Sequence, residues 1–248
     1  MGDLGNVLLI VGALAVIGAL TWYRWQAHKK KTGEFTAAAA ERGWEYQAVD
    51  ESRTNRFLGT PFGEGHSRRA EHVLRGTYRG RTMQAFEYSY KETRGRGDHI
   101  YSEGYERANR RAGNTEHISP HQRTKTSTFT VVALLSPAPR PTLELTREGW
   151  GRKLLGMVGV RDLQLESEQF NKTFHIRTND DKFAYAILNP PMMEWMLADQ
   201  RALSIPFRFE RGDIVVWVEE KIDLARVDHL LDYASEILDR TPDFVWKD

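Results

Sequence analysis

The sequence predicts an α+β protein, in which an N-terminal transmembrane helix precedes a cytoplasmic domain of antiparallel hairpins with packed helices. Three observations predict it. An uncharged, apolar run of 20 residues lies near the N-terminus, about the length that spans a bilayer as a helix. Short segments of alternating polarity come in pairs around Gly-containing turns, which is typical of hairpins. Helical periodicity recurs between these pairs, so helices interleave with hairpins.

The predicted membrane span covers residues 4–23. It lacks the basic flank and the A-x-A-like site of a cleaved signal peptide, so we expect an uncleaved anchor. Basic residues come only after the span, in the juxtamembrane segment 24–33. This asymmetry predicts a single-pass protein of a bacterial plasma membrane, with residues 1–3 outside and the large domain in the cytoplasm.

Aromatic and basic side chains follow the span and are expected at the membrane interface, with the lipid bilayer as one partner. Small residues share one face of the span, which would permit self-association. The alternative is the general abundance of Gly and Ala in membrane helices. The interface residues are Trp22, Tyr23, Arg24, Trp25, Lys29, Lys30 and Lys31, and the small residues are Gly5, Gly12, Ala15 and Ala19.

Composition excludes several classes of protein. The chain has 0 cysteines, which excludes a disulfide scaffold, a thiolate zinc site and a cysteine nucleophile. Its 35 basic and 34 acidic residues nearly balance, so the net charge gives no reason to expect a nucleic-acid partner.

A proline run divides the rest into two predicted α+β subdomains, 34–136 and 142–248. In the first we expect a helix over 34–43 capped by Thr36, a strand over 44–49 and a helical turn within 50–58. Strands over 72–78, 82–90 and 126–135 follow, the last pairing with the second. The polar segment 93–124 between them lacks a core pattern and is predicted to be a mobile loop.

The second subdomain is predicted to alternate strands and helices. Asp180 or Asp181 caps one helix, Pro191 suits the first turn of the next, and Asp223 caps a long amphipathic helix that ends before Thr241. The strands are expected over 142–146, 162–166, 173–178, 205–210 and 213–218, with a helical turn over 151–158.

The best candidate for a ligand site is a Gly-rich bend followed by cationic and hydroxyl side chains, which together could hold a small anion. The spacing matches neither a P-loop nor a dinucleotide fingerprint. An ordinary turn before a strand is the competing interpretation. The residues are Gly63, Gly65, His66, Ser67, Arg68 and Arg69.

Other chemistry is less well supported. His117 and His121 have the spacing of helical zinc ligands, but Pro120 lies between them, so we expect no metal site and no cofactor. Glu166 and Glu168 would share one face of a strand and could form an acid/base pair. No G-x-S-x-G element marks a serine nucleophile.

Two stretches resemble a group of uncharacterised actinobacterial single-span membrane proteins. The first comprises residues 42–46 and 56–90, and the second comprises residues 165–197 followed by Phe207, Phe209 and the Arg211-Gly212 turn. The second is also similar to a bacterial domain family of unknown function with an E-x-x-x-F-x-x-x-F-x-[VI] pattern, an acidic pair, A-x-x-[IL]-L and a proline. The resemblance implies an inner-membrane location and implies nothing about a substrate. The matching residues are Glu166, Phe170, Phe174, Ile176, Asp180, Asp181, Ala186, Ile187, Leu188 and Pro190.

The sequence thus predicts a membrane-anchored interaction or scaffold domain with a protein partner. One alternative is an anchored enzyme or anionic-ligand sensor centred on residues 63–69. Another is nucleic-acid binding through the loop 93–124, where aromatic and arginine side chains are interspersed.

Overall fold

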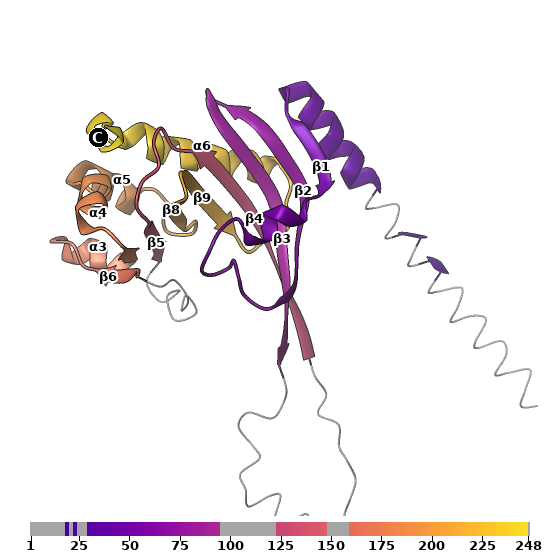
Figure 1. Cartoon of the computed structure of the whole chain (residues 1–248), viewed down its shortest axis with the longest axis horizontal. Coiled ribbons are helices and arrows are strands. Elements are labelled where there is room, and N and C mark those ends of the chain that lie inside the picture. The colour runs from indigo at the N-terminus through magenta and orange to yellow at the C-terminus, as the bar shows by residue number, and fades with distance from the viewer. Residues whose placement is uncertain (1–17, 20–21, 24–28, 95–122, 148–158, 248) are drawn as a thin grey trace, which may run out of the picture.

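The computed structural model describes residues 18–19, 22–23, 29–94, 123–147 and 159–247 (Figure 1). Most of the predicted span, most of the loop 93–124 and the helical turn predicted at 151–158 lie outside these ranges. Within them, no helix is both long and apolar enough to cross a bilayer.

The described residues form a mixed α and β structure built on one antiparallel sheet of nine strands, as the sequence predicts in outline. Every neighbouring pair is antiparallel. From one edge to the other the strands are β1 (Glu45–Val49), β2 (His66–Tyr78), β3 (Arg81–Arg94), β4 (Arg123–Leu135), β9 (Asp213–Val218), β8 (Phe207–Glu210), β5 (Leu143–Arg147), β7 (Phe174–Thr178) and β6 (Arg161–Leu163).

The predicted boundary between subdomains falls inside this sheet. Strands β1 to β4 come from the first predicted subdomain and the other five from the second, and β4 pairs with β9 where they meet. The predicted pairing of β3 with β4 is confirmed and extends to Arg94↔Arg123. The hairpin of β8 with β9 across Arg211 and Gly212 is also confirmed.

The helices of the second half begin at side-chain caps. Asp180, Asn189 and Asp223 each accept a hydrogen bond from a first-turn amide, which confirms two of the predicted starts. These helices are α4 (Asp181–Ile187), α5 (Pro190–Ala198) and α6 (Leu224–Arg240), and the 3₁₀ turn η3 (Asp243–Trp246) follows α6. A second 3₁₀ turn, η1 (Glu51–Asn55), lies in the first half between β1 and β2.

Three predictions of local structure are wrong. The first helix covers residues 29–42, and the hydroxyl of Thr36 donates to the Thr32 carbonyl within it, so Thr36 is not a cap. Strand β2 begins at His66 and not at residue 72 as predicted. The sequence does not indicate the earlier start, because positive φ at Ser67 and His72 and two register shifts interrupt the alternation of side chains. Residues 168–173 form α3 (Glu168–Thr173), which Ser167 caps, rather than continuing a strand.

Two apolar clusters lie on opposite faces of the sheet, because successive side chains of a strand alternate. On the helical face, Leu74, Val132 and Val216 pack with residues of α6 and of the helix 29–42. On the loop face, Tyr88, Val131 and Trp217 pack beneath the loop 56–65, which connects η1 to β2. Figure 1 shows α6 and this loop on opposite sides of the strands.

Candidate functional site

The residues predicted to bind an anion do not converge on one point. The His66 ring nitrogens lie 3.1 Å from Ser67 Oγ and 3.0 Å from Thr93 Oγ1. Arg68 donates to the side-chain oxygen of Asn55 at 3.5 Å, and Arg69 donates to Glu71 at 3.4 Å. These four β2 residues are exposed, and the structure directs their polar groups to separate neighbours rather than into a common pocket.

The two glycines before β2 differ in their surroundings. Both have positive φ, +85° at Gly63 and +57° at Gly65. A Cβ on Gly63 would meet open space, whereas one on Gly65 would overlap the Lys91 carbonyl oxygen and lie 2.6 Å from the Tyr90 ring. Gly65 therefore permits a close backbone approach to β3.

The other predicted site residues have structural partners or lie outside the described residues. Glu168 is on α3 and pairs with Lys172 at 2.7 Å, so Glu166 and Glu168 do not share a strand face as predicted. Asp181 pairs with Arg161 at 2.6 Å. No cluster of potential metal ligands occurs among the described residues. Outside them lie His117, His121, Arg24, Trp25, Gly5, Gly12 and Ala15.

The predicted membrane-interface residues that are described divide into two sets. Trp22 and Tyr23 are 61% and 70% exposed, as side chains at a membrane interface could be. The basic residues belong to the helix 29–42, where Lys30 lies 3.9 Å from Glu34. Lys31 instead turns to the domain and lies 3.3 Å from Glu87.

This helix docks on the domain, and it includes residues 29–33, which the sequence predicts as part of a separate juxtamembrane segment. Phe35 is 2% exposed and stacks on the ring of His72, with centroids 5.1 Å apart. Arg42 donates to both carboxylate oxygens of Asp228, at 2.7 and 2.9 Å, at the other end of the helix. Glu87 ties the same region to the start of α6 by accepting from the Ile222 amide at 2.9 Å.

Beneath the docked helix lies a polar pair formed by a half-buried tyrosine and a buried histidine. The Tyr46 hydroxyl is 2.9 Å from His72 Nδ1, and His72 is almost fully buried. Burial raises the pKa of the Tyr46 hydroxyl above its ordinary value. The sequence shows that aromatic and histidine side chains are present in this region. Only the fold shows that Phe35 packs against Tyr46 and His72.

On the loop face, a fully buried arginine holds the loop 56–65 in place. Arg208 of β8 is 0% exposed, and its Nε donates to Glu144 of β5 at 2.5 Å. It also donates to two backbone carbonyls of the loop, that of Leu58 and, at 2.8 Å, that of Thr60. Its guanidinium lies over the Trp217 ring, 5.1 Å from the centroid.

Two neighbouring carboxylates complete this cluster. Glu210 accepts from the Leu58 amide at 3.0 Å, and Asp213 accepts from Arg56 at 2.6 Å. Burial raises the pKa of Glu210 and of Asp213 above their ordinary values, although the arginines oppose the shift. Since these groups bond to the loop itself, the cluster serves to fix the loop on the sheet.

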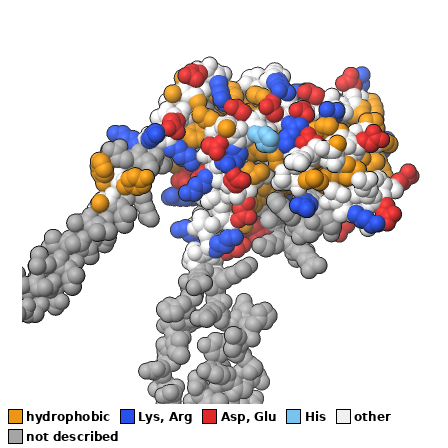
Figure 2. Space-filling view, turned by 180° about the vertical axis from the view of Figure 1, so that it is seen from behind, with side chains coloured by type: hydrophobic (Ala, Val, Ile, Leu, Met, Phe, Trp, Pro, Cys, Tyr) orange, Lys and Arg blue, Asp and Glu red, His pale blue; other side chains and the backbone are white. Residues whose placement is uncertain are grey.

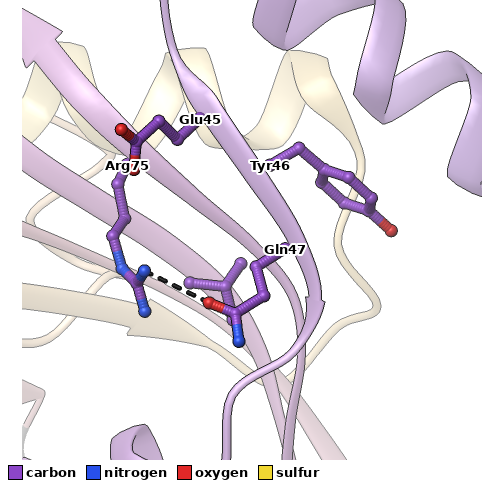
Figure 3. A pocket seen from close by; sticks show the side chains of 5 residues that line it. Glu45, Tyr46, Gln47 and Arg75 are labelled. Atoms are coloured by element: carbon purple, nitrogen blue, oxygen red, sulfur yellow. Dashed lines mark hydrogen bonds between the residues drawn. The ribbon is translucent and has the colours of Figure 1, made fainter.

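A shallow pocket of about 440 Å³ lies at the β1 edge. Figure 3 shows Glu45, Gln47 and Arg75 on one side of β1, whereas Tyr46 projects to the other side. Arg75 donates to the Gln47 side-chain oxygen at 3.2 Å. Val73 also lines the pocket. The pocket therefore offers a small apolar area between the acidic Glu45 and the basic Arg75.

Charges of both signs mix on the outer surface, as Figure 2 shows for one face. Along α6, Asp232 and Asp239 pair with Arg79 and Arg81 of the β2–β3 hairpin, at 2.5 and 2.6 Å. This pairing joins the C-terminal helix to the first half of the sheet and leaves no one sign dominant along it.

Comparisons with known proteins give a partial family match and a likeness of fold. Residues 139–235, from before β5 into α6, match the family described as "Protein of unknown function (DUF3137)". No curated protein matches the chain. The crystal structure of the mycobacterial trehalose monomycolate transport factor A, TtfA, is similar with a TM-score of 0.56 and 13% identity, over 84% of this chain and 93% of that chain. At this identity the likeness concerns the fold alone.

Proposed function

We propose that the chain is a membrane-anchored accessory factor for the transport of an envelope glycolipid, and that it acts by binding a protein partner. In this proposal residues 4–23 span the plasma membrane, residues 1–3 are outside, and the domain works in the cytoplasm. The subdomains 34–136 and 142–248 act as one body on their shared sheet.

The docked helix 29–42 supports the proposal that the domain is anchored in the membrane. It follows the predicted span by a few residues, and Phe35, Lys31 and Arg42 each contact the domain. Because only five residues separate the predicted span from this helix, the proposal places the domain close to the membrane, where a neighbour in the same membrane can reach it.

The likeness to TtfA suggests the transport part. The shared fold extends over 84% of this chain, including both halves of the sheet, so more than the DUF3137 match is involved. That protein is described as a trehalose monomycolate transport factor. A long-chain glycolipid is therefore the cargo class to test first.

The alternatives receive less support. An anion-binding sensor or enzyme at residues 63–69 would need its cations to converge, and His66, Arg68 and Arg69 have separate partners. Nucleic-acid binding was predicted through the loop 93–124, most of which lies outside the described residues.

The experiment depletes the protein in the cells that make it and follows newly labelled glycolipids by pulse-chase. We expect the labelled precursor to accumulate in the plasma-membrane fraction, and re-expression of the full chain to restore its export. Unchanged export under full depletion would refute the transport role.

The predicted topology has its own test. A reporter fused after Asp248 should be active if it works only in the cytoplasm, and silent if it works only outside. The reverse pattern would contradict the proposed orientation.

A further inference from the structure

The two edges of the sheet are protected to different extents. At one edge, β6 has only 3 residues, and its Arg161 is held by Asp181 of α4. At the other edge, β1 has 5 residues without a proline, and its register with β2 runs without a shift from Glu45↔Arg75 to Val49↔Glu71. Short strands, prolines and bulges are the devices that usually prevent edge pairing.

The outward backbone groups of β1 follow from its pairing with β2. The Asp50 amide donates to the Ala70 carbonyl of β2 at 3.0 Å. Because antiparallel bonding alternates, Tyr46 and Ala48 also bond toward β2, whereas Glu45, Gln47 and Val49 direct their N–H and C=O groups away from the sheet. The Gln47 side chain donates to one of these groups, the Val49 carbonyl, at 2.8 Å.

Among the described residues, no strand pairs with the outer edge of β1. Four of the five β1 residues are exposed. In Figure 3, β1 runs in the foreground, and the helix lies to the side toward which Tyr46 points. The helix 29–42 therefore covers the helical face near β1 and, within the described ranges, leaves the backbone edge unpaired.

We propose that β1 pairs antiparallel with β1 of a second copy of this chain, about a two-fold axis at Gln47, so that two nine-stranded sheets become one. Three residue pairs would then exchange backbone bonds, Gln47 with its own counterpart and Glu45 with Val49 in both directions. The pairing does not depend on the transport role.

The side chains of β1 fit this register. On the loop face, Glu45 of one copy meets Val49 of the other, so two like charges never face each other across the new pair. On the helical face, the large Tyr46 meets the small Ala48. These matches belong to β1 paired with itself, and they favour a second copy over an unrelated extended peptide.

The symmetry also suits two anchored chains. A two-fold axis that relates antiparallel strands within a sheet is perpendicular to the sheet. The helical faces of both copies, and thus both helices 29–42, therefore lie on the same side. Two predicted spans can then enter one bilayer, where confinement raises the effective concentration of the copies.

A single cysteine tests the register, because the chain has 0 cysteines of its own. The full chain with Gln47→Cys should form a disulfide-linked dimer in native membranes under mild oxidation. The two Cα atoms of the central pair would be about 5.5 Å apart, within the range of about 4.4–6.8 Å for disulfides. The control is Glu194→Cys, at an exposed position on α5, which should remain monomeric.

A proline tests the edge itself. Gln47→Pro removes an outward N–H but none of the bonds to β2, so the domain should fold and lose the dimer. Gln47→Ala should keep the dimer, with mass measured by analytical ultracentrifugation of the full chain in detergent and folding by circular dichroism. If Gln47→Pro fails to fold, the cysteine result decides.

Three outcomes would overturn the proposal. The wild-type chain could be monomeric at every concentration. The Gln47→Pro dimer could persist, which would place self-association elsewhere, such as in the predicted span. Gln47→Cys could form its disulfide with a different protein, which would make β1 a docking edge for a partner instead.

Discussion

The helical face and the loop face of the sheet are covered in different ways. On the helical face, α6 and the helix 29–42 bury apolar side chains, and ion pairs such as Arg42–Asp228 lie at the partly exposed rim. On the loop face, the loop 56–65 has no regular secondary structure, and Arg208, Glu144 and Glu210 hold it from within. Apolar side chains can be buried in several relative positions, because the hydrophobic effect has no direction. A buried ion network fixes the loop at one place, because each charged group needs its own partner.

The difference predicts where substitutions cost most. A rim ion pair contributes little because water screens it. A buried ion that loses its partner remains in a medium of low dielectric constant and costs several kcal/mol.

Arg208→Ala should have the largest effect. It leaves Glu144 buried without its cation, leaves Glu210 with the more exposed Arg211 at 3.8 Å, and leaves two loop carbonyls without this donor. We therefore expect a loss of about 3–5 kcal/mol in the free energy of unfolding. Urea denaturation of the purified protein measures this loss. A cost no greater than that of Arg42→Ala would show that the network does not hold the loop.

Phe35→Ala tests the docking of the first helix. Removing this buried ring should cost about 3 kcal/mol and release the helix 29–42 from His72. Hydrogen exchange of the helix amides should accelerate, while that of the loop 56–65 stays as it is. The matched variant Phe62→Ala should give the reverse pattern. Unchanged protection of the helix in Phe35→Ala would contradict the docking.

Gly65→Ala and Gly63→Ala separate steric overlap from backbone strain. Both glycines have positive φ, so each substitution should cost about 1 kcal/mol through the backbone. Only at Gly65 would the added Cβ also overlap Lys91 and Tyr90, which should bring its total to about 2–3 kcal/mol. Thermal unfolding of both variants measures the difference. Equal stability of the two variants would mean that β3 can shift to make room for the added Cβ without a cost in stability.

The loop face should also respond to pH. Burial raises the folded-state pKa of Glu210 above its ordinary value of 4.5, so the folded protein binds this proton at a higher pH than the unfolded chain does. The contribution of Glu210 to stability therefore rises as the pH falls from neutral through its raised pKa. Asp199, whose pKa Arg201 lowers, has the opposite effect, but only near and below its ordinary value of 3.8.

Glu210→Gln removes the effect of Glu210 protonation on stability. The stability of the wild-type protein relative to this variant should increase between about pH 7 and pH 4.5, as measured by urea midpoints at each pH. Parallel pH profiles of the two proteins would contradict the direction of the shift.

Arg42→Ala should have the smallest effect. Its ion pair with Asp228 is about one third exposed on both sides, so we expect a loss of no more than about 1 kcal/mol, which added salt reduces further. Denaturation at low and high ionic strength measures it. A loss as large as that of Phe35→Ala would mean that charge, rather than apolar burial, docks the helix.

Local patterns in the sequence were enough for several elements. Strands β3 and β4 alternate cleanly, and α6 combines a cap at Asp223 with an apolar stripe, so both were predicted. The sequence predicts only the second half of β2, because positive φ at Ser67 and His72 interrupts the alternation of its side chains. It does not predict the short α3, because a helix of about one and a half turns gives little periodicity.

The buried cluster could not be foreseen in the same way. Glu144 and Arg208 each occupy the polar position of an alternating strand, which ordinarily faces water. Their burial comes from Leu58 and Thr60, about 150 residues earlier in the chain than Arg208. The predicted anion site does not form because the polar groups of His66, Arg68 and Arg69 bond to separate neighbours, which short-range sequence spacing does not reveal.

The proposed transport role and the proposed anchor can be tested together by glycolipid export in depleted cells that express either the full chain or residues 29–248 at equal levels. If the anchored domain serves export, the full chain should restore it and the chain without its predicted span should not. Equal restoration by both would refute the need for an anchor, because the domain would then act without it.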